Sequence, residues 1–383
     1  MHLLATSGAD IDDLEQAVDL AQSPAEVVVL SFSDSDLSAL AEAWTASSAE
    51  LPSLRLASLK RLKHPMSVDL YIDRVVLGAR AVVVRCLGGL DYWRYGLERL
   101  AAVCRSRGIL FAALPGDDRA DERLDALSTL PLETTTRLYG YLHEGGVGNA
   151  REAVRYLAAL LGRETRFAEP VAIGSIVGFV PDRGAVVIDD LCRSDDGRPT
   201  ALVVFYRASL LAADTAGIAE LMAAVEREGL AAVAVAVTSL KDPSIAEPLA
   251  QLIRQRRISI ILNATAFSAL RDDGTSVLDV ADVPVLQIVQ AQSTQEVWAS
   301  SSRGLSPTDL AMNVVLPELD GRLLARPIAF KGETAADERL QFGAVRYVPQ
   351  ADRIAYVAQL AARWGRLRAL PAAERRIALM LSD

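Results

Sequence analysis

The chain has 383 residues, of which 51% are hydrophobic and 23% are charged, and its 40 lysines and arginines against 49 aspartates and glutamates give a net charge of −9. This composition excludes a disordered chain, a collagen-like repeat and a charged coiled coil. At roughly 150 residues per domain the length predicts two domains and a remainder, and the negative charge disfavours nucleic acid, since basic residues cluster only at 254–257 and 363–368.

The sequence shows no signal for export or for membrane insertion. The longest apolar run, residues 230–237, is far shorter than the roughly 20 residues that a membrane span needs. The first residues lack the basic region, apolar region and cleavage site of a signal peptide. Three widely spaced cysteines, Cys86, Cys104 and Cys192, form neither a disulfide framework nor a thiol metal site. We therefore expect a cytoplasmic protein without a membrane span.

Short β-branched runs alternate with helical periodicity in the first half of the chain. Residues 27–30, 81–84 and 109–114 are predicted strands. Apolar residues recur at helical spacing at Leu14, Ala17, Val18 and Ala21, at Leu97, Leu100, Ala101 and Cys104, and at Val154, Leu157, Ala158 and Leu161. Residues 119–161 contain no convincing strand. These patterns predict a first α/β domain over residues 1–165, with a parallel sheet and a helical cap.

A second series of strands and helices follows a stretch rich in Gly, Pro, Arg and Asp. We expect residues 166–200 to be a linker with irregular strands that enter the second domain. Predicted strands at 201–205, 231–237, 258–262 and 283–289 alternate with helices, and a helix follows at about 351–370. The expected fold class is α/β, with two doubly wound, mainly parallel sheet domains in tandem, the second over residues 201–370. Residues 371–383 are predicted to be the first strand of a further, truncated domain.

Ligands of open α/β sheets bind beyond the carboxyl ends of the strands. Polar strand-to-helix turns are expected there at residues 85–89, 115–118 and 238–242. In the first turn, Gly88 and Gly89 would let a ligand approach the backbone, and Arg85 could hold a carboxylate in a bidentate pair. An ordinary βα turn explains the same residues and is the more frequent case.

Two further segments have both a functional and a structural interpretation. His64, one of three histidines, precedes Pro65 and could bind a metal or move protons, although on this segment alone a surface loop in which Ser67 or Asp69 caps a helix is favoured. Residues 144–149, EGGVGN, match no nucleotide-binding spacing, so the end of one helix and the start of another is expected. Without HExxH, GxSxG or paired cysteines, the residues alone predict only a ligand-binding α/β protein.

Nine segments occur in one order along the chain: LKHPMSVDLY, VVVRCLGGLDYWRYGLE, LPGDD, HEGG, VVFYRASL, TSLKD, LNATAFS, PVLQ and DLAMNVVLPELDGR. Together they resemble the large subunit of aerobic cobaltochelatase, whose close relative is the H subunit of magnesium chelatase. The resemblance covers essentially the whole chain. Members of this family are several times longer, so we expect the chain to be an N-terminal portion.

The resemblance implies a subunit that holds a tetrapyrrole while separate AAA+ ATPase and integrin-I-like subunits use ATP and Mg²⁺. HPMSVD and FYRASL favour the cobalt branch, which implies insertion of Co²⁺ into hydrogenobyrinic acid a,c-diamide in aerobic cobalamin biosynthesis. This portion alone is expected to be inactive. Two alternatives stay open: an H-type subunit for insertion of Mg²⁺ into protoporphyrin IX, and a non-catalytic corrinoid-binding or docking scaffold.

Metal insertion removes two pyrrolic protons and strips water from the metal, for which histidine and carboxylates are suited. His64 is the expected catalytic residue, and no resident metal site is expected. The basic candidates for holding substrate carboxylates are Arg85, Arg207 and Lys241. The aromatic candidates for its apolar faces are Tyr92, Trp93, Tyr95 and Tyr206. The remaining substrate-binding candidates are Asn263, Asn313 and Glu318, for which structural hydrogen bonding is an equal alternative.

Overall fold

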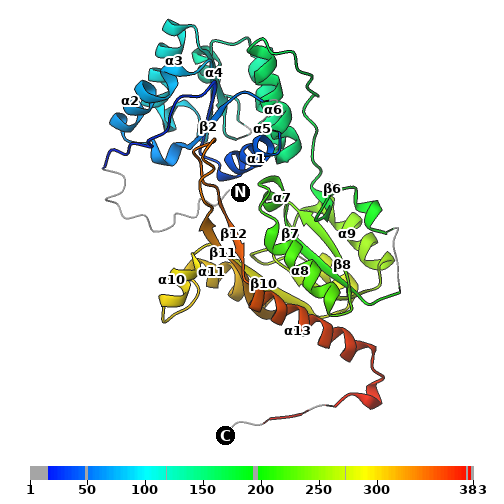
Figure 1. The fold of residues 1–383 in the computed structure, drawn as a ribbon. Coiled ribbons are helices and arrows are strands. Elements are labelled where there is room, and N and C mark those ends of the chain that lie inside the picture. Colours follow the sequence, from blue (N-terminus) through cyan, green and yellow to red (C-terminus); the bar gives the residue numbers. More distant parts are fainter. Residues whose placement is uncertain are drawn as a thin grey trace. The chain divides into compact units, whose positions relative to one another are not determined.

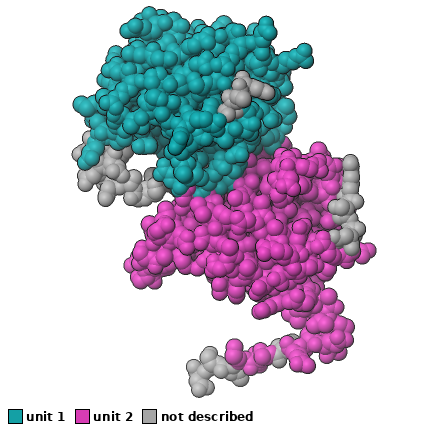
Figure 2. All heavy atoms as spheres, in the orientation of Figure 1, with its two compact units in different colours: residues 1–173, 211–214, 333–346 teal, residues 174–210, 215–332, 347–383 magenta. Residues whose placement is uncertain are grey.

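The computed structural model describes residues 16–47, 51–117, 119–192, 197–271, 273–376 and 378–380 (Figure 1). The chain divides into two compact units, which are coloured separately in Figure 2. Unit 1 comprises residues 1–173, 211–214 and 333–346, and unit 2 comprises residues 174–210, 215–332 and 347–383. Both units are α/β, which agrees with the expected class at this level.

Unit 1 contains a parallel four-stranded sheet in the order β2-β1-β3-β4. Its strands are β1 (Val27–Ser31), β2 (Leu54–Ser58), β3 (Ala81–Cys86) and β4 (Leu110–Pro115). Alternate residues of each strand enter two separate apolar clusters, as in a parallel sheet covered on both faces. The three predicted strands are confirmed, and β2 is an additional one.

Helices cover both faces of this sheet. One face packs against α1 (Asp34–Thr45), α5 (Leu132–Glu144) and α6 (Gly146–Leu160). The other packs against α2 (Pro65–Arg74), α3 (Arg94–Arg107) and α4 (Glu122–Leu127). Short 3₁₀ turns form η2 (Leu59–Arg61), η3 (Val76–Gly78) and η4 (Leu90–Tyr92). The EGGVGN segment is a helix junction as predicted, since α5 ends at Glu144 and α6 begins at Gly146.

The amphipathic helix predicted around Ala17, Val18 and Ala21 is wrong, and Leu14 lies outside the described residues. Its backbone N–H groups find other partners: Val18 N–H donates to Ser67 Oγ at 2.7 Å. The Ala21 N–H donates to Asp19 Oδ1 at 2.9 Å, and Ala21 has a φ of 52°. A side-chain acceptor two residues earlier competes with helical hydrogen bonding, which explains the irregular chain.

Unit 2 contains an eight-stranded sheet in the order β12-β11-β10-β9-β7-β8-β5-β6. Its parallel strands are β7 (Thr200–Tyr206), β8 (Ala231–Val237), β9 (Ile258–Asn263), β10 (Val285–Ala291) and β11 (Leu323–Glu333). The antiparallel strands β5 (Ile176–Val180) and β6 (Gly184–Val186) lie at one edge, and β12 (Val345–Pro349) at the other. The four strands predicted in this region are confirmed.

Helices also lie on both faces of the unit 2 sheet. On one face are α8 (Ala216–Arg227) and α13 (Ala351–Ala369), and on the other α9 (Pro243–Gln255), η5 (Ile188–Cys192) and η6 (Val277–Ala281). The remaining short elements are α7 (Arg207–Leu211), α10 (Gln295–Ser300), α11 (Pro307–Leu310), the π-helix η7 (Ala311–Val315), α12 (Leu316–Leu319) and η8 (Ala372–Glu374). The predicted helix at about 351–370 corresponds to α13.

Residues after α13 form no strand within the part that the structure describes. Leu379 and Met380 are exposed there. The assignment of residues 371–383 to a further domain stays a prediction. None of the helices in the described ranges has the length and apolar character that a membrane crossing requires.

Candidate functional site

The sheet of unit 2 has a topological switch point between β7 and β9. From β7 the chain goes to β8 on one side, and β9, β10 and β11 continue on the other side. Open α/β sheets bind ligands at the carboxyl ends of the strands that flank such a point. The two strands end there at Tyr206 and Asn263, both of which the sequence singled out.

The Asn263 amide is completely buried and fully hydrogen-bonded. Its Nδ2 donates to Gln287 Oε1 at 2.8 Å and to the Thr265 carbonyl at 3.1 Å, while its Oδ1 accepts from the Thr265 hydroxyl at 2.9 Å. Gln287 in turn donates to the same carbonyl at 2.9 Å. Each polar atom of Asn263 is thus paired inside the protein, so this residue positions the loop after β9.

A buried ion pair completes this network. Arg322 donates to Gln287 Oε1 at 3.1 Å and to Asp320 Oδ2 at 2.9 Å, and both charged side chains are only 3% exposed. Asp320 also accepts from the Ser268 hydroxyl at 2.7 Å and from the Ala269 N–H at 2.6 Å. Burial lowers the pKa of Arg322. The additional hydrogen bonds offset the desolvation of the two charges.

The loop after β9 holds an exposed aromatic residue in an unusual backbone conformation. Phe267 has a φ of 66° and is 37% exposed. Its N–H donates to the Met312 carbonyl of the π-helix at 2.7 Å. The preceding carbonyl, that of Ala266, accepts from the Tyr206 hydroxyl at 2.9 Å, and burial raises the pKa of Tyr206. A bulky residue at positive φ costs about 1–3 kcal/mol, and the hydrogen bonds to β7 and to the π-helix hold it there.

The π-helix beside this loop carries another predicted residue, Asn313. Its Nδ2 donates to Asp309 Oδ1 at 3.3 Å. Asp309 also accepts from the Gln292 N–H at 3.1 Å and from the Ser306 hydroxyl at 3.0 Å. Burial raises the pKa of Asp309. Single turns of π-helix are frequent at functional sites.

Three predicted residues of unit 2 lie outside this network. Arg207 opens α7 and donates to the Gly174 carbonyl at 3.4 Å. Lys241 is exposed in the turn after β8, and Glu318 is exposed on α12. The structure thus brings Tyr206, Asn263 and Asn313 to the loop after β9 and its neighbouring π-helix, while Arg207 and Lys241 follow the ends of β7 and β8 at the same edge of the sheet.

The corresponding switch point of unit 1 lies between β1 and β3 and is filled by the chain's own side chains. Arg85 donates from Nη1 to Asp36 Oδ1 at 2.8 Å and to the Leu142 carbonyl at 2.9 Å. Asp36 Oδ2 accepts from the Ser31 hydroxyl at 2.8 Å. A substrate carboxylate at Arg85 would have to replace Asp36.

The glycine pair beside Arg85 serves a structural contact. A Cβ atom at Gly89, whose φ is 71°, would lie 2.6 Å from Asp121 Oδ2. Asp121 accepts from the Leu90 N–H at 3.0 Å and pairs with Arg123 at 2.8 Å. These hydrogen bonds hold the pKa of Asp121 well below its usual range. The absence of a side chain at Gly89 thus leaves room for the carboxylate of Asp121, a residue of the chain itself, and not for a ligand.

The aromatic candidates of unit 1 differ in exposure. Trp93 is buried and donates from Nε1 to the Leu62 carbonyl at 2.8 Å. Tyr92 is exposed and packs edge to face on Phe32, with 5.0 Å between ring centroids. Tyr95 is exposed and donates to Asp69 Oδ2 at 2.7 Å, which raises the pKa of Tyr95. Only Tyr92 and Tyr95 have ring surface available to a ligand.

His64 is the N-cap of α2. Its Nδ1 accepts from the Met66 N–H at 3.2 Å. The interpretation in which Ser67 or Asp69 caps this helix is therefore wrong, and the Ser67 hydroxyl instead accepts from the Val18 N–H. Because Nδ1 is the acceptor, the proton of the neutral imidazole is on Nε2.

Within the described ranges, no group of three or more His, Cys, Asp or Glu residues is placed to hold a metal ion. Sequence reasoning also missed Arg322 and Asp320 as members of the site. Both lie at the end of the segment DLAMNVVLPELDGR, directly before a strand. The pattern of an acidic and a basic residue on either side of a glycine at a strand start was the signal that could have indicated them.

A protein-family profile described as CobN/Magnesium Chelatase matches residues 139–383. The aerobic cobaltochelatase subunit CobN of Pseudomonas aeruginosa is 39% identical over 387 residues, which cover 100% of this chain and 31% of that protein. The same subunit of Sinorhizobium sp is 37% identical over 397 residues, again covering 100% and 31%. The H subunit of magnesium chelatase from Rhodobacter capsulatus is 24% identical over 357 residues, or 82% of this chain and 29% of that protein.

Among solved structures, the catalytic subunit of cobaltochelatase from Mycobacterium tuberculosis matches with a TM-score of 0.73 and 28% identity. The match covers 91% of this chain and 28% of that chain. The chain thus spans less than a third of the length of these relatives.

Proposed function

The chain belongs to the CobN/Magnesium Chelatase family, and on this premise we propose that it is the N-terminal part of the tetrapyrrole-binding subunit of an ATP-dependent cobaltochelatase. The proposed reaction of the whole enzyme inserts Co²⁺ into hydrogenobyrinic acid a,c-diamide in aerobic cobalamin biosynthesis. One observation carries the proposal: the cobaltochelatase subunits are 39% and 37% identical over all of this chain, against 24% over 82% of it for a magnesium-chelatase subunit.

We propose the switch point of unit 2 as the substrate-binding surface of this portion. Phe267 offers an exposed ring for an apolar face of the tetrapyrrole, while Tyr206 and Asn263 fix the loop that carries it. Lys241 and Arg207 supply cations for substrate carboxylates at neighbouring strand ends. Asn313 positions the π-helix, and Glu318 is an exposed polar contact.

In unit 1 the exposed rings of Tyr92 and Tyr95 are proposed to contact substrate, with Trp93 and Arg85 in supporting positions. His64 is proposed to handle a proton or the incoming metal. In the neutral imidazole the basic nitrogen is Nδ1, so accepting a proton requires that the hydrogen bond from Met66 opens. The metal is a substrate, and its bound water molecules are replaced by the ring nitrogens of the tetrapyrrole.

We propose that energy comes from AAA+ ATPase and integrin-I-like partner subunits that bind ATP and Mg²⁺, so that this portion alone does not catalyse insertion. The proposed domain division follows the sequence prediction: doubly wound domains over residues 1–165 and 201–370, a helical cap on the first, a linker with irregular entry strands at 166–200 and the start of a further domain at 371–383. A cytoplasmic location accompanies this assignment.

A scaffold without a role in chemistry is the second candidate. The observation that favours it is the ion pair between Arg85 and Asp36, which fills the switch point of unit 1. In that case unit 1 would hold neighbouring protein parts and would contribute nothing to substrate binding.

The deciding experiment is a titration of the purified 383-residue chain with hydrogenobyrinic acid a,c-diamide, followed by visible absorbance. A saturable shift at micromolar concentration supports the proposal. A shift with protoporphyrin IX alone would assign the chain to the magnesium branch, and no shift with either would favour the scaffold. The variant Phe267→Ala should weaken a genuine shift, whereas Tyr356→Ala, which removes an exposed ring from α13, is the matched control.

A further inference from the structure

The end of α13 carries a cluster of arginines that the proposed substrate site does not use. Residues 363–376 contain five arginines and one acidic residue, Glu374, and therefore a net charge of +4 in a chain of net charge −9. The five members, all exposed, are Arg363, Arg366, Arg368, Arg375 and Arg376. We call this set the α13 arginine cluster.

The charge of this cluster is not compensated within the described part of the chain, where none of its members forms an ion pair. Its hydrogen bonds go to backbone carbonyls: Arg368 donates to that of Asp282, and Arg375 donates to those of Leu370 and Arg368 at 3.0 and 3.3 Å. Carbonyls hold the side chains in place without neutralising them. The other basic run of the sequence differs, since Arg254 pairs with Glu247 at 3.3 Å.

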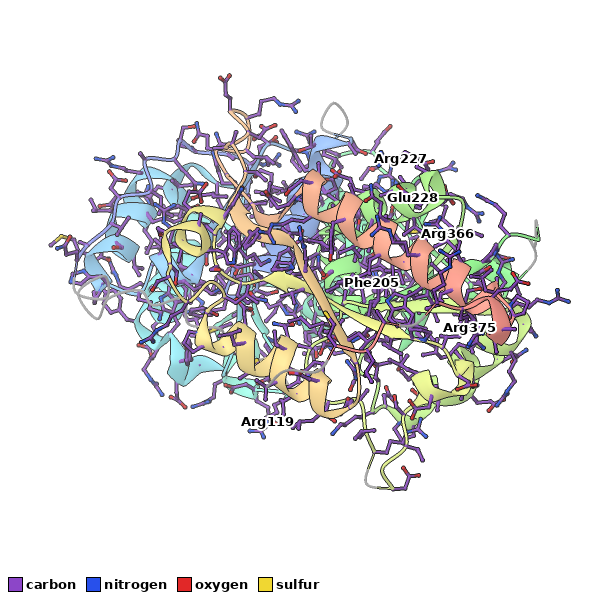
Figure 3. The ribbon with its side chains drawn as sticks, turned by 90° about the horizontal axis from the view of Figure 1, so that it is seen from below. Arg119, Phe205, Arg227, Glu228, Arg366 and Arg375 are labelled. Carbon is purple, nitrogen blue, oxygen red and sulfur yellow. The ribbon has the colours of Figure 1, made fainter. Side chains whose placement is uncertain are left out.

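The α13 arginine cluster lies at the amino edge of the unit 2 sheet. Arg368 donates to the carbonyl of Asp282, which precedes β10, and a Cβ atom at Gly365 would lie 3.3 Å from Cδ2 of Leu230, which precedes β8. In Figure 3, Arg366 and Arg375 mark this end of α13. Because parallel strands begin at this edge, it is the opposite edge from the one where Tyr206 and Asn263 end β7 and β9.

The helix dipole explains only part of the cluster. Arg366 and Arg368 lie in the last turn of α13, where cations are favourable. Arg375 and Arg376 lie beyond the helix, and a dipole effect falls off within one turn. The remaining positive charge is therefore available to a partner.

Two exposed leucines, Leu367 and Leu370, lie among the arginines. Arginine next to exposed apolar side chains is typical of protein interfaces. We propose that the α13 arginine cluster docks an acidic protein segment, with Asp and Glu side chains on the guanidinium groups and apolar side chains on the two leucines. This inference is independent of tetrapyrrole binding.

The test is fluorescence anisotropy of a labelled oligoglutamate peptide with the 383-residue chain at low salt. The variant Arg363→Glu/Arg366→Glu should weaken binding about tenfold or more, because close charges are reversed. The control Arg61→Glu/Arg119→Glu changes two exposed arginines of unit 1 and lowers the net charge by the same amount. It should change binding by less than about twofold.

The peptide binding should also fall steeply as salt rises, and an oligoglutamine peptide of equal length should not bind. Circular dichroism checks that both variants are folded, which their exposed positions favour. Absence of peptide binding, or equal loss in both double variants, would overturn the proposal. Tighter binding of a single-stranded oligonucleotide than of the acidic peptide would overturn it in favour of nucleic acid.

Discussion

Arg85 and Asp36 form an ion pair with a distance of 2.8 Å between Nη1 and Oδ1, and their side chains are only 11% and 8% exposed. They come from the end of β3 and the start of α1, at the position in unit 1 where an open α/β sheet would bind a ligand. The pair joins the sheet to α5 as well, because Arg85 also donates to the Leu142 carbonyl. The contribution of this ion pair to the stability of the fold can be measured separately from a contribution of Arg85 to substrate binding.

Replacement of Arg85 by Met should destabilise the chain by about 3–5 kcal/mol, because Asp36 would remain buried without its cation. The double variant Arg85→Met/Asp36→Asn should recover much of this loss, and urea unfolding measures both. If Arg85 holds a substrate carboxylate, the double variant should fold but bind hydrogenobyrinic acid a,c-diamide more weakly. A single variant as stable as the parent chain would contradict the structural role.

His64 can be tested with two substitutions that differ in their ability to cap α2. Replacement by Ala removes the acceptor of the Met66 N–H and should cost about 1 kcal/mol of stability, whereas Asn retains a capping oxygen and should cost little. If His64 moves a proton in the full subunit, both variants should lose chelation rate. Normal chelation by His64→Asn would reduce His64 to a helix cap.

Phe267 allows a strained backbone and an exposed ring to be tested separately. Phe267→Gly should be more stable than Phe267→Ala by about 1 kcal/mol, because glycine adopts a φ of 66° without strain. Thermal or urea unfolding checks this order. Both variants lack the ring, so both should lose the proposed tetrapyrrole binding equally. Equal stability of the two variants would show that the backbone relaxes.

The sequence predicted most of the sheet because parallel strands covered on both faces are continuous apolar runs. The strand β2 escaped prediction because Arg55 interrupts its apolar pattern. In the structure Arg55 is buried and donates to the carbonyls of Ser23 and Leu54 at 2.8 and 2.9 Å. These hydrogen bonds compensate for the burial of the charged side chain, but they depend on the tertiary fold and cannot be recognised in the local sequence.

In the candidate site, too, features set by the local sequence were predictable and features set by contacts between distant residues were not. Tyr206 and Asn263 were predictable since each ends a recognisable strand. The bond between Ser268 and Asp320 joins residues 52 positions apart, and the positive φ of Phe267 depends on a contact with the π-helix. Polar networks of this kind follow from packing, so the sequence indicated only the strand ends.

Asp309 gives a prediction of pH dependence. Burial raises the pKa of Asp309, so the folded state binds its proton more tightly than the unfolded state does. The resulting stabilisation is complete below the unfolded value, about 3.9, and is lost as pH rises through the folded value. Asn cannot titrate, so the stability of Asp309→Asn relative to the parent chain should increase from about pH 4 towards neutrality.

Urea midpoints of the two chains across that pH range measure the difference. Ser306→Ala is the control, because it removes one hydrogen bond to Asp309 and keeps the carboxyl group. Its stability should keep a dependence on pH through this range. Parallel pH profiles of Asp309→Asn and the parent chain would contradict this prediction, because Asp309 would then have the same pKa in the folded and unfolded states. In that case the hydrogen bonds from the Gln292 N–H and the Ser306 hydroxyl would stabilise the carboxylate enough to cancel the effect of burial on its pKa.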